Sequence, residues 1–197
     1  MTKFQDMVYE HPDAPALRAE VRALTEELRS ADSYENAREV FLREDRLSRR
    51  VGTLQELANI RHSIDTRDEF YEAEIRFWNG FAPELKEDAS AFARAMLKTP
   101  FRNEFEREFG GLMFRNAEME LESFSPEIIP EMQQENELTQ EYAKLLASAQ
   151  IPFDGRKLTL AQMTPFKTAA DDSVRLAAWK AEGQWYKDHQ AQLDSIY

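Results

Sequence analysis

The chain contains no cysteine, few glycines and few histidines. Without cysteine there can be no disulfide, no thiolate nucleophile and no cysteine-ligated zinc or iron–sulfur site, and the composition fits a reducing cytoplasm. Six glycines in 197 residues argue against an all-β sandwich or barrel. No apolar run approaches the roughly 20 residues that a membrane-spanning helix needs, so we expect no membrane span.

The sequence also lacks the short motifs that announce most catalytic sites. There is no His-Glu-x-x-His zinc pattern, no Gly-x-Ser-x-Gly elbow, no phosphate-binding Gly-x-x-x-x-Gly-Lys-Ser/Thr loop and no Gly-x-Gly-x-x-Gly. His11, His62 and His189 lie too far apart in sequence for any two to chelate a metal from one helix. We therefore predict no catalytic, cofactor-binding or metal-binding residue in this chain.

The charge balance is strongly acidic, with 37 Asp and Glu against 25 Lys and Arg and a formal net charge of -12. Nucleic acid and anionic membrane surfaces would repel such a chain, so we expect neither as a partner. The charge is better explained by solubility. The first residues, MTKFQDMVYEHPD, lack the basic and apolar regions of a signal peptide, and we expect a cytoplasmic protein.

Apolar residues recur at helical spacing along nearly the whole chain, which predicts an all-α, multi-helix array. The first helix, for example, has Leu17, Val21, Leu24 and Leu28 on one face. We expect N-caps at Asp13, at Asp32 or Ser33, and at Asp171-Asp172, and a start of the third helix at Asp65 or Thr66. The expected helices cover about 14–30, 34–64 with a break at Gly52-Thr53, 65–82, 83–98, 101–124 with an interruption at Gly110-Gly111, a short turn at Ser125-Pro126, 130–149, a short one after Thr159 or Thr164, and a last one from about 171.

One segment differs from the rest. Residues 149–160, AQIPFDGRKLTL, contain two short runs around Asp154-Gly155, and Asp-Gly is a strong hairpin signal. Pro152 places its strand at an edge. This hairpin is the only β-structure that we predict.

Clusters of carboxylates offer the nearest approach to a metal site. Asp65, Asp68 and Glu72 are spaced to share one face of a helix. A carboxylate metal site in a helix bundle usually also needs Glu-x-x-His, which is absent. Salt bridges to the arginines between these carboxylates, on a solvated face, explain the cluster better than a metal site does. We interpret Glu118, Glu120 and Glu122 in the same way, as residues of a solvated face.

The histidines and aromatic residues also have ordinary structural explanations. We expect His11 at the surface, His62 on a helix surface or at a cap, and His189 on a solvated face. The stripe of Phe101, Phe105 and Phe109 is more typical of a core than of a ligand-binding surface.

The helix expected from about 171 carries two apolar stripes, one with Val174, Ala178, Ala181, Trp185 and Ile196, the other with Leu176, Trp179, Gly183, Tyr186, Leu193 and Tyr197. A helix that is apolar on two faces is normally packed between layers. It ends without a glycine, proline or basic stop signal. We interpret it as a helix that continues into a missing part of the protein, against which Trp179 and Trp185 would bury; the alternative is that the terminal aromatics fray.

Five stretches, in this order and spacing, resemble the oligoendopeptidase F branch of the thimet-like zinc oligopeptidases. They are Ile60-Arg61-His62-Ser63-Ile64-Asp65-Thr66 with Asp68, Phe70-Tyr71 and Glu74; Phe124-Ser125-Pro126-Glu127-Ile128-Ile129; Glu135-Asn136-Glu137-Leu138 with Tyr142; Ile151-Pro152-Phe153-Asp154-Gly155 with Leu158 and Leu160; and Asp172 with Arg175 and the helix to Leu193-Asp194-Ser195-Ile196-Tyr197. The resemblance extends from about residue 33 to the end.

The resemblance implies a mostly helical zinc metalloendopeptidase that admits short peptides to a deep channel. In that family a His-Glu-x-x-His motif and a later Glu hold Zn²⁺, but no position here matches them. Residues 1–197 would thus be the N-terminal helical region of such an enzyme, with a possible subdivision near 110–125. Alone, this region would be inactive and would bind no zinc. Its partners would be short peptides and the missing C-terminal catalytic domain.

An alternative reading is a stand-alone helical module that binds peptides or proteins without catalysis. In either case exposed apolar surface would favour self-association of the isolated chain.

Overall fold

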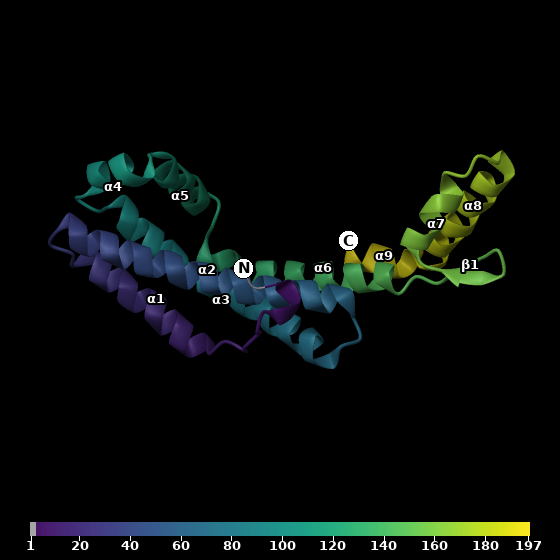
Figure 1. The fold of residues 1–197 in the computed structure, drawn as a ribbon, viewed down its shortest axis with the longest axis horizontal. Helices are drawn as coiled ribbons and strands as arrows, with labels where there is room; N and C mark the ends of the chain where they lie inside the picture. The colour runs from purple at the N-terminus through teal and green to yellow at the C-terminus, as the bar shows by residue number, and fades with distance from the viewer. Residues whose placement is uncertain (1–2) are drawn as a thin grey trace. The chain divides into compact units, whose positions relative to one another are not determined.

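The computed structural model describes residues 3–197, which form nine α-helices, two short 3₁₀ helices and one two-stranded hairpin (Figure 1). This confirms the all-α prediction with a single short hairpin. The chain divides into two compact units, Met1–Gln133 and Gln134–Tyr197. The two units are described separately below.

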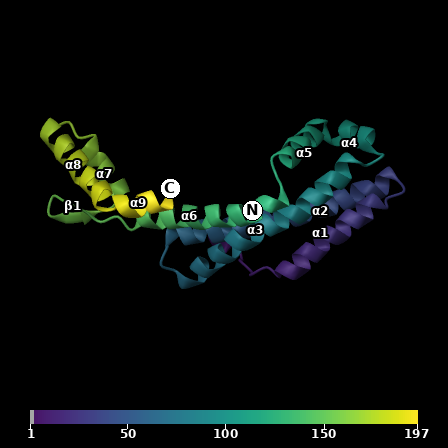
Figure 2. The same ribbon diagram turned by 180° about the vertical axis from the view of Figure 1, so that it is seen from behind.

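The first unit is built on three helices. After the 3₁₀ helix η1 (Phe4–Asp6) come α1 (Ala14–Arg29), α2 (Tyr34–Ile64) and α3 (Glu69–Leu97), then α4 (Arg102–Phe109), α5 (Leu112–Glu122), the 3₁₀ helix η2 (Pro126–Ile128) and the beginning of α6 (Ile129–Ala147). Figures 1 and 2 show α1, α2 and α3 side by side, with α4 near the end of α3 and α5 running back along one side of α3.

The beginnings of the helices follow local chemistry that the sequence discloses. The side chains of Asp13, Ser33, Thr159 and Asp171 each accept hydrogen bonds from backbone N–H groups of the first helical turn, as predicted. The third helix begins later than predicted, because Asp68 is its cap rather than Asp65 or Thr66.

Two expected helix breaks are absent. The helix α2 continues through Gly52, and α3 continues through Pro83. Proline removes one backbone hydrogen bond and displaces a nearby carbonyl, which weakens a helix unless another donor compensates. The acceptor that loses its backbone donor at Pro83 is the carbonyl of Asn79, four residues earlier. The adjacent carbonyl of Gly80 accepts a hydrogen bond from Gln133 Nε2 at 2.6 Å, which adds a tertiary contact at this turn of the continuous helix. The predicted division of α3 at Pro83 was therefore wrong.

The interruption at Gly110-Gly111 is confirmed, since α4 ends at Phe109 and α5 begins at Leu112. Gly110 has a φ of 86°, a backbone conformation that side chains with a Cβ rarely adopt.

The core of the first unit collects apolar side chains from α1 to α5. It includes Leu17, Val21, Leu24, Leu28, Ala37, Val40, Leu47, Val51, Ala58, Ile75, Trp78, Phe81, Phe92, Ala95, Met96, Phe105 and Phe114. The ring of Phe105 is fully buried and lies edge-on to Tyr34 and Phe41, with centroid distances of 5.1 and 5.5 Å. Of the predicted core stripe of Phe101, Phe105 and Phe109, Phe105 is thus a core residue, whereas Phe109 is exposed.

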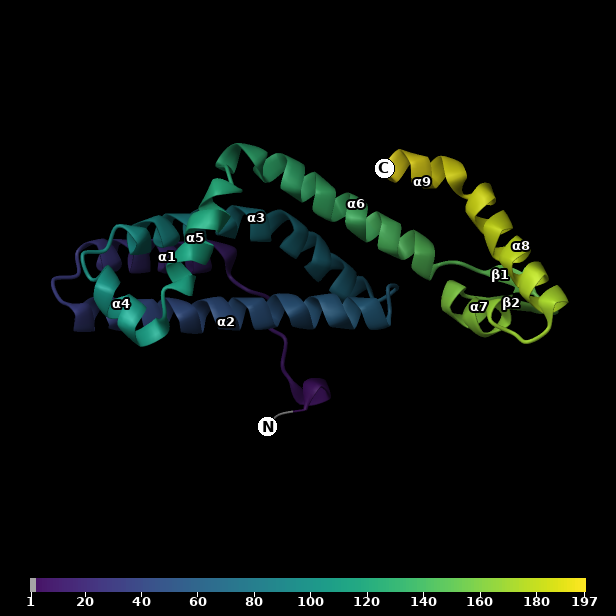
Figure 3. The ribbon, with the colours of Figure 1, turned by 90° about the horizontal axis from the view of Figure 1, so that it is seen from above.

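The second unit contains the predicted hairpin. Strands β1 (Ile151–Phe153) and β2 (Arg156–Leu158) pair antiparallel, and Asp154 and Gly155 form the two-residue turn with φ of 51° and 69°. Positive φ at both positions is why Asp-Gly is favoured there. Figure 3 shows the hairpin grouped with α7 (Leu160–Lys167) and α8 (Asp172–Asp188).

The long last helix predicted from residue 171 is interrupted near its end. The helix α8 stops at Asp188, and α9 (Gln190–Ile196) follows after His189. The Nδ1 atom of His189 lies 2.8 Å from the carbonyl of Trp185, and its ring stacks on the Trp185 ring at 4.3 Å. His189 is therefore half-buried at a helix junction, whereas the sequence predicted a solvated face.

We expect Phe105→Ala to lower the free energy of unfolding of the first unit by about 3–5 kcal/mol, because it removes a fully buried ring. Phe109→Ala, one turn along α4, is the matched control, because that ring is 38% exposed and should lose less than half as much. Urea unfolding followed by circular dichroism measures both. Equal losses for the two variants would contradict this account of the core.

Candidate functional site

One cluster of polar groups in the first unit surrounds Glu74 on α3. Its buried carboxylate accepts a hydrogen bond from the hydroxyl of Tyr9 and lies 2.8 Å from Nδ1 of His11. The Tyr9 oxygen in turn accepts from Trp78 Nε1 at 3.1 Å. These contacts fix the segment before α1 to the surface of α3.

Burial of Tyr9, and then its hydrogen bond to Glu74, raise the pKa of its hydroxyl well above the ordinary value of a tyrosine. A phenol in this state remains protonated and donates to the carboxylate at every physiological pH. The His11 ring stacks on Phe77 with a centroid distance of 4.5 Å. His11 is exposed, as predicted, but it also belongs to this cluster, which is suited to anchoring the segment rather than to catalysis.

Arg61 on α2 provides a second anchor for the same segment. Its guanidinium donates to the carbonyl of Met7 and, at 2.7 Å, to the hydroxyl of Tyr71. It also lies over the rings of Phe4 and Tyr71 at 5.9 and 5.7 Å. The sequence signals Arg61 only as a charge among carboxylates, so this role could not be predicted.

The prediction that His62 lies on a helix surface or at a cap was wrong. Its side chain is buried, 7% exposed, and Nε2 lies 3.0 Å from Glu72 Oε2 on α3. The reason is a tertiary contact: Glu72 on α3 pairs with the His62 ring, and this face of α2 is covered. The pairing of His62 with Glu72 joins the end of α2 to the beginning of α3.

The carboxylates weighed as a metal site do not share one helix face. Asp65 follows α2 as its C-cap and Asp68 precedes α3 as its N-cap. Asp65 pairs with Arg67 at 3.0 Å and Glu72 pairs with Arg76 at 3.3 Å, which confirms the salt-bridge interpretation. Hydrogen bonds from Arg67 lower the pKa of Asp65.

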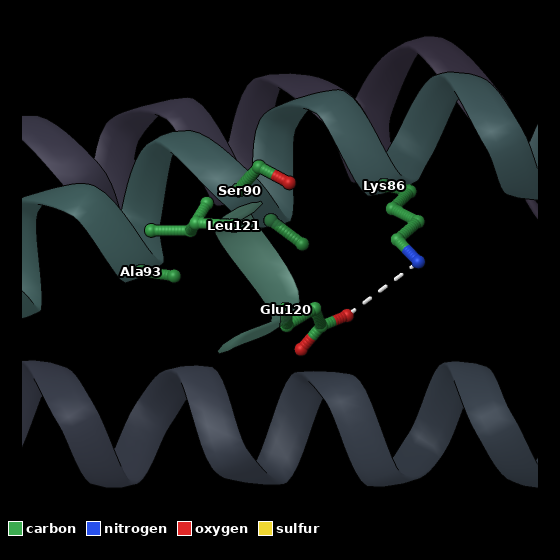
Figure 4. A pocket seen from close by; sticks show the side chains of 6 residues that line it. Lys86, Ser90, Ala93, Glu120 and Leu121 are labelled. Atoms are coloured by element: carbon green, nitrogen blue, oxygen red, sulfur yellow. Dashed lines mark ion pairs between the residues drawn. The ribbon is translucent and has the colours of Figure 1, made fainter. Parts of the chain in front are cut away.

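Two of the three acidic residues of α5 form ion pairs. Glu118 pairs with Arg102 at 3.1 Å, and Glu120 lies 3.7 Å from Lys86. Figure 4 shows the second pair beside a small pocket lined by Ser90, Ala93 and Leu121. The pocket has a volume of about 50 Å³, room for a few water molecules and not for a substrate.

Within residues 3–197 there is no group of three or more His, Asp or Glu side chains that could hold a metal ion. The residues of this part of the chain therefore do not fit a zinc site. Over the same residues, no helix has both the length and the apolar character needed to cross a membrane.

The second unit exposes an apolar stripe on α8, formed by Leu176, Trp179 and Tyr186. Leu176 is 56% exposed and Trp179 58% exposed, while Trp185 on the other face is buried. The core beneath consists of Leu145, Ala149, Ile151, Leu158, Met163, Ala178 and Trp185. Of the two tryptophans expected to bury against a missing part of the protein, Trp185 is instead buried within its own unit, and Trp179 is exposed.

A buried ion pair supports the exposed tryptophan from below. Lys167 on α7 lies 2.8 Å from Glu182 Oε1, and its ammonium lies 4.8 Å from the centre of the Trp179 ring. Burial, and then the charge of Glu182, raise the pKa of the nearby Tyr186 hydroxyl. Within the α8 stripe, the exposed Trp179 ring is thus contacted by a cation that is itself paired with a buried carboxylate.

Residues 4–124 match the family described as the peptidase M3 N-terminal domain. The chain belongs to this family. Solved structures of peptidases match nearly the whole chain, including the α8 stripe. One of them, PZ peptidase A with an inhibitor, is 36% identical, with a TM-score of 0.95 over 99% of this chain. No curated protein matches.

Two structures assigned as oligoendopeptidase F match equally well. One, solved at 3.1 Å, is 38% identical with a TM-score of 0.96, and one from Bacillus anthracis str. Ames is 33% identical with a TM-score of 0.96, each over 100% of this chain. The 197-residue chain spans only about a third of the length of these three structures, between 35% and 36%. The resemblance to the oligoendopeptidase F branch is confirmed.

We expect the loss of stability caused by Tyr9→Phe to shrink as the pH rises above about 10. The pKa of Tyr9 is raised in the folded chain, so its stabilising contribution is complete below the ordinary tyrosine pKa of about 10 and declines above it. Urea unfolding of both proteins between pH 8 and pH 11.5 measures the difference. A difference that stays constant over this range would contradict the raised pKa.

Proposed function

We propose that this chain is the N-terminal helical part of a zinc-dependent oligoendopeptidase that hydrolyses internal bonds of short peptides. The observation that carries the proposal is the match of 99–100% of the chain to peptidase structures that are 33–38% identical. At this identity both units of the chain keep the same fold as the peptidases. The lack of cysteine supports a place in the cytoplasm.

In this proposal the catalytic groups belong to a part of the protein outside these residues. Zinc in such enzymes is bound by three protein side chains and polarises the scissile carbonyl, while a carboxylate activates the attacking water. Residues 3–197 bring together no such set of ligands. The role that we assign to this chain is therefore the wall of a peptide channel, with no chemical step of its own.

The α8 stripe is the surface on which the catalytic part is proposed to pack. An exposed leucine and tryptophan on neighbouring turns are unusual for a surface that stays in water. Burying the exposed part of both side chains, a little over half of each, would contribute roughly 2–3 kcal/mol. The Trp179 ring already contacts Lys167, which is paired with Glu182, so less entropy is lost on docking.

A second candidate function rests on the same exposed stripe. A stand-alone module could use Leu176 and Trp179 to bind a protein partner or a second copy of itself. The match to peptidases across both units favours the first proposal.

We expect a hybrid in which this chain replaces the matched part of PZ peptidase A to cleave a short internally quenched peptide. The same hybrid should lose activity with a zinc chelator and regain it with added zinc, because the metal site comes from the peptidase part. The 197-residue chain alone should bind no stoichiometric zinc and cleave nothing.

The controls are intact PZ peptidase A and its portion without the matched region. A hybrid that binds one equivalent of zinc yet fails to cleave would contradict the proposed role of this chain. Zinc-dependent cleavage by the chain alone would contradict the assignment of catalysis to the other part.

We expect a cysteine introduced by Leu176→Cys to be alkylated rapidly in the isolated chain and at least about tenfold more slowly in the hybrid, because docking would bury it. Met119→Cys on α5 is the matched control, since that side chain is also exposed and should react equally in both. Mass spectrometry of the tryptic peptides resolves each site. Protection of position 176 that instead grows with concentration of the isolated chain would favour a second copy as the partner.

A further inference from the structure

The ends of α1 and α3 enclose a pocket that the proposed peptidase function does not use. Its volume is about 330 Å³, and it is lined by Leu28, Arg29, Arg94, Ala95, Lys98, Thr99 and Pro100. Leu28 and Ala95 are buried and form an apolar floor, while the charged side chains lie at the surface. The volume lies at the lower end of the range of small-molecule sites.

Three cations and no carboxylate line this pocket, in a chain with a net charge of -12. Arg29 forms an ion pair with Glu26. Among residues 3–197, Arg94 and Lys98 have neither an ion pair nor a side-chain hydrogen bond, although most arginines of the chain have carboxylate partners. Like charges four residues apart on a helix repel each other, so this pair is retained at some cost in stability.

The helix ends themselves account for only part of this charge. Basic residues near a helix C-terminus are favourable, because that end carries about half a negative charge. Two helix ends therefore supply about one negative charge, and Glu26 supplies a second. Three cations exceed that sum by about one positive charge, so the pocket attracts an anion.

We propose that this pocket binds a small molecule with a phosphate group. Arginine presents a planar fork of N–H donors that matches phosphate oxygens, and lysine adds a mobile point charge. The Thr99 hydroxyl oxygen accepts from the N–H of Phe101 at 3.4 Å, which leaves its own hydrogen to donate. The apolar floor suits a ring or short chain attached to the phosphate.

The test is calorimetric titration of the 197-residue chain with AMP and, separately, with inorganic phosphate at low salt. One saturable site is expected. Tighter binding of AMP would identify an organic phosphate as the ligand class, because only AMP reaches the apolar floor; equal affinity would identify free phosphate. No saturable binding of either probe would overturn the proposal.

The double variant Arg94→Gln, Lys98→Gln should weaken binding by at least about tenfold, because both charged donors are removed. Arg115→Gln, Lys180→Gln is the matched control, since both side chains are exposed, have no partner within residues 3–197 and remove the same charge. It should change the affinity by less than about twofold. Equal weakening by the two double variants would overturn the site and indicate general charge attraction.

Discussion

The first unit depends on two buried carboxylates of α3, each of which is held by residues that precede or belong to α1. Asp88 accepts hydrogen bonds from Arg18 Nε at 2.5 Å and Arg22 Nε at 2.7 Å, and this contact raises the pKa of Arg18 further. Glu74, fourteen residues earlier on α3, holds Tyr9 and His11. A buried carboxylate that lost its donors would be strongly destabilising, so these pairs fix where the first residues of the chain lie on α3.

Such pairs determine position more than they add stability. An apolar replacement of similar shape is often as stable as a buried ion pair, whereas a pair is intolerant of displacement. The core residues Leu17, Val21 and Leu24 supply most of the favourable burial between α1 and α3. Arg18, on the same helix, contacts Asp88, Glu84 and Glu87 and so selects one register of α1 along α3.

The sequence is sufficient where the decisive interaction is local. Helix caps such as Asp13 and Ser33, the Asp154-Gly155 turn and the interruption at Gly110 each depend on a few neighbouring residues, and they were predicted correctly. Pro83 and His62 were not, because their environment is created by residues distant in sequence. Gln133 donates to the carbonyl of Gly80, in the turn before Pro83, from 53 positions away, and Glu72 pairs with His62 from another helix.

The two stripes of the last long helix illustrate the same limit at a functional surface. The sequence predicts that both stripes are apolar, but only the fold decides which one the unit buries itself. The hairpin and α7 cover the face of Ala178 and Trp185, while Lys167 reaches past them to Glu182 with its ammonium over the Trp179 ring. The attraction between a cation and an aromatic ring becomes stronger as water is removed. Covering Trp179 therefore strengthens a contact that already exists, which makes the α8 stripe better suited to a permanent packing surface than to transient exposure.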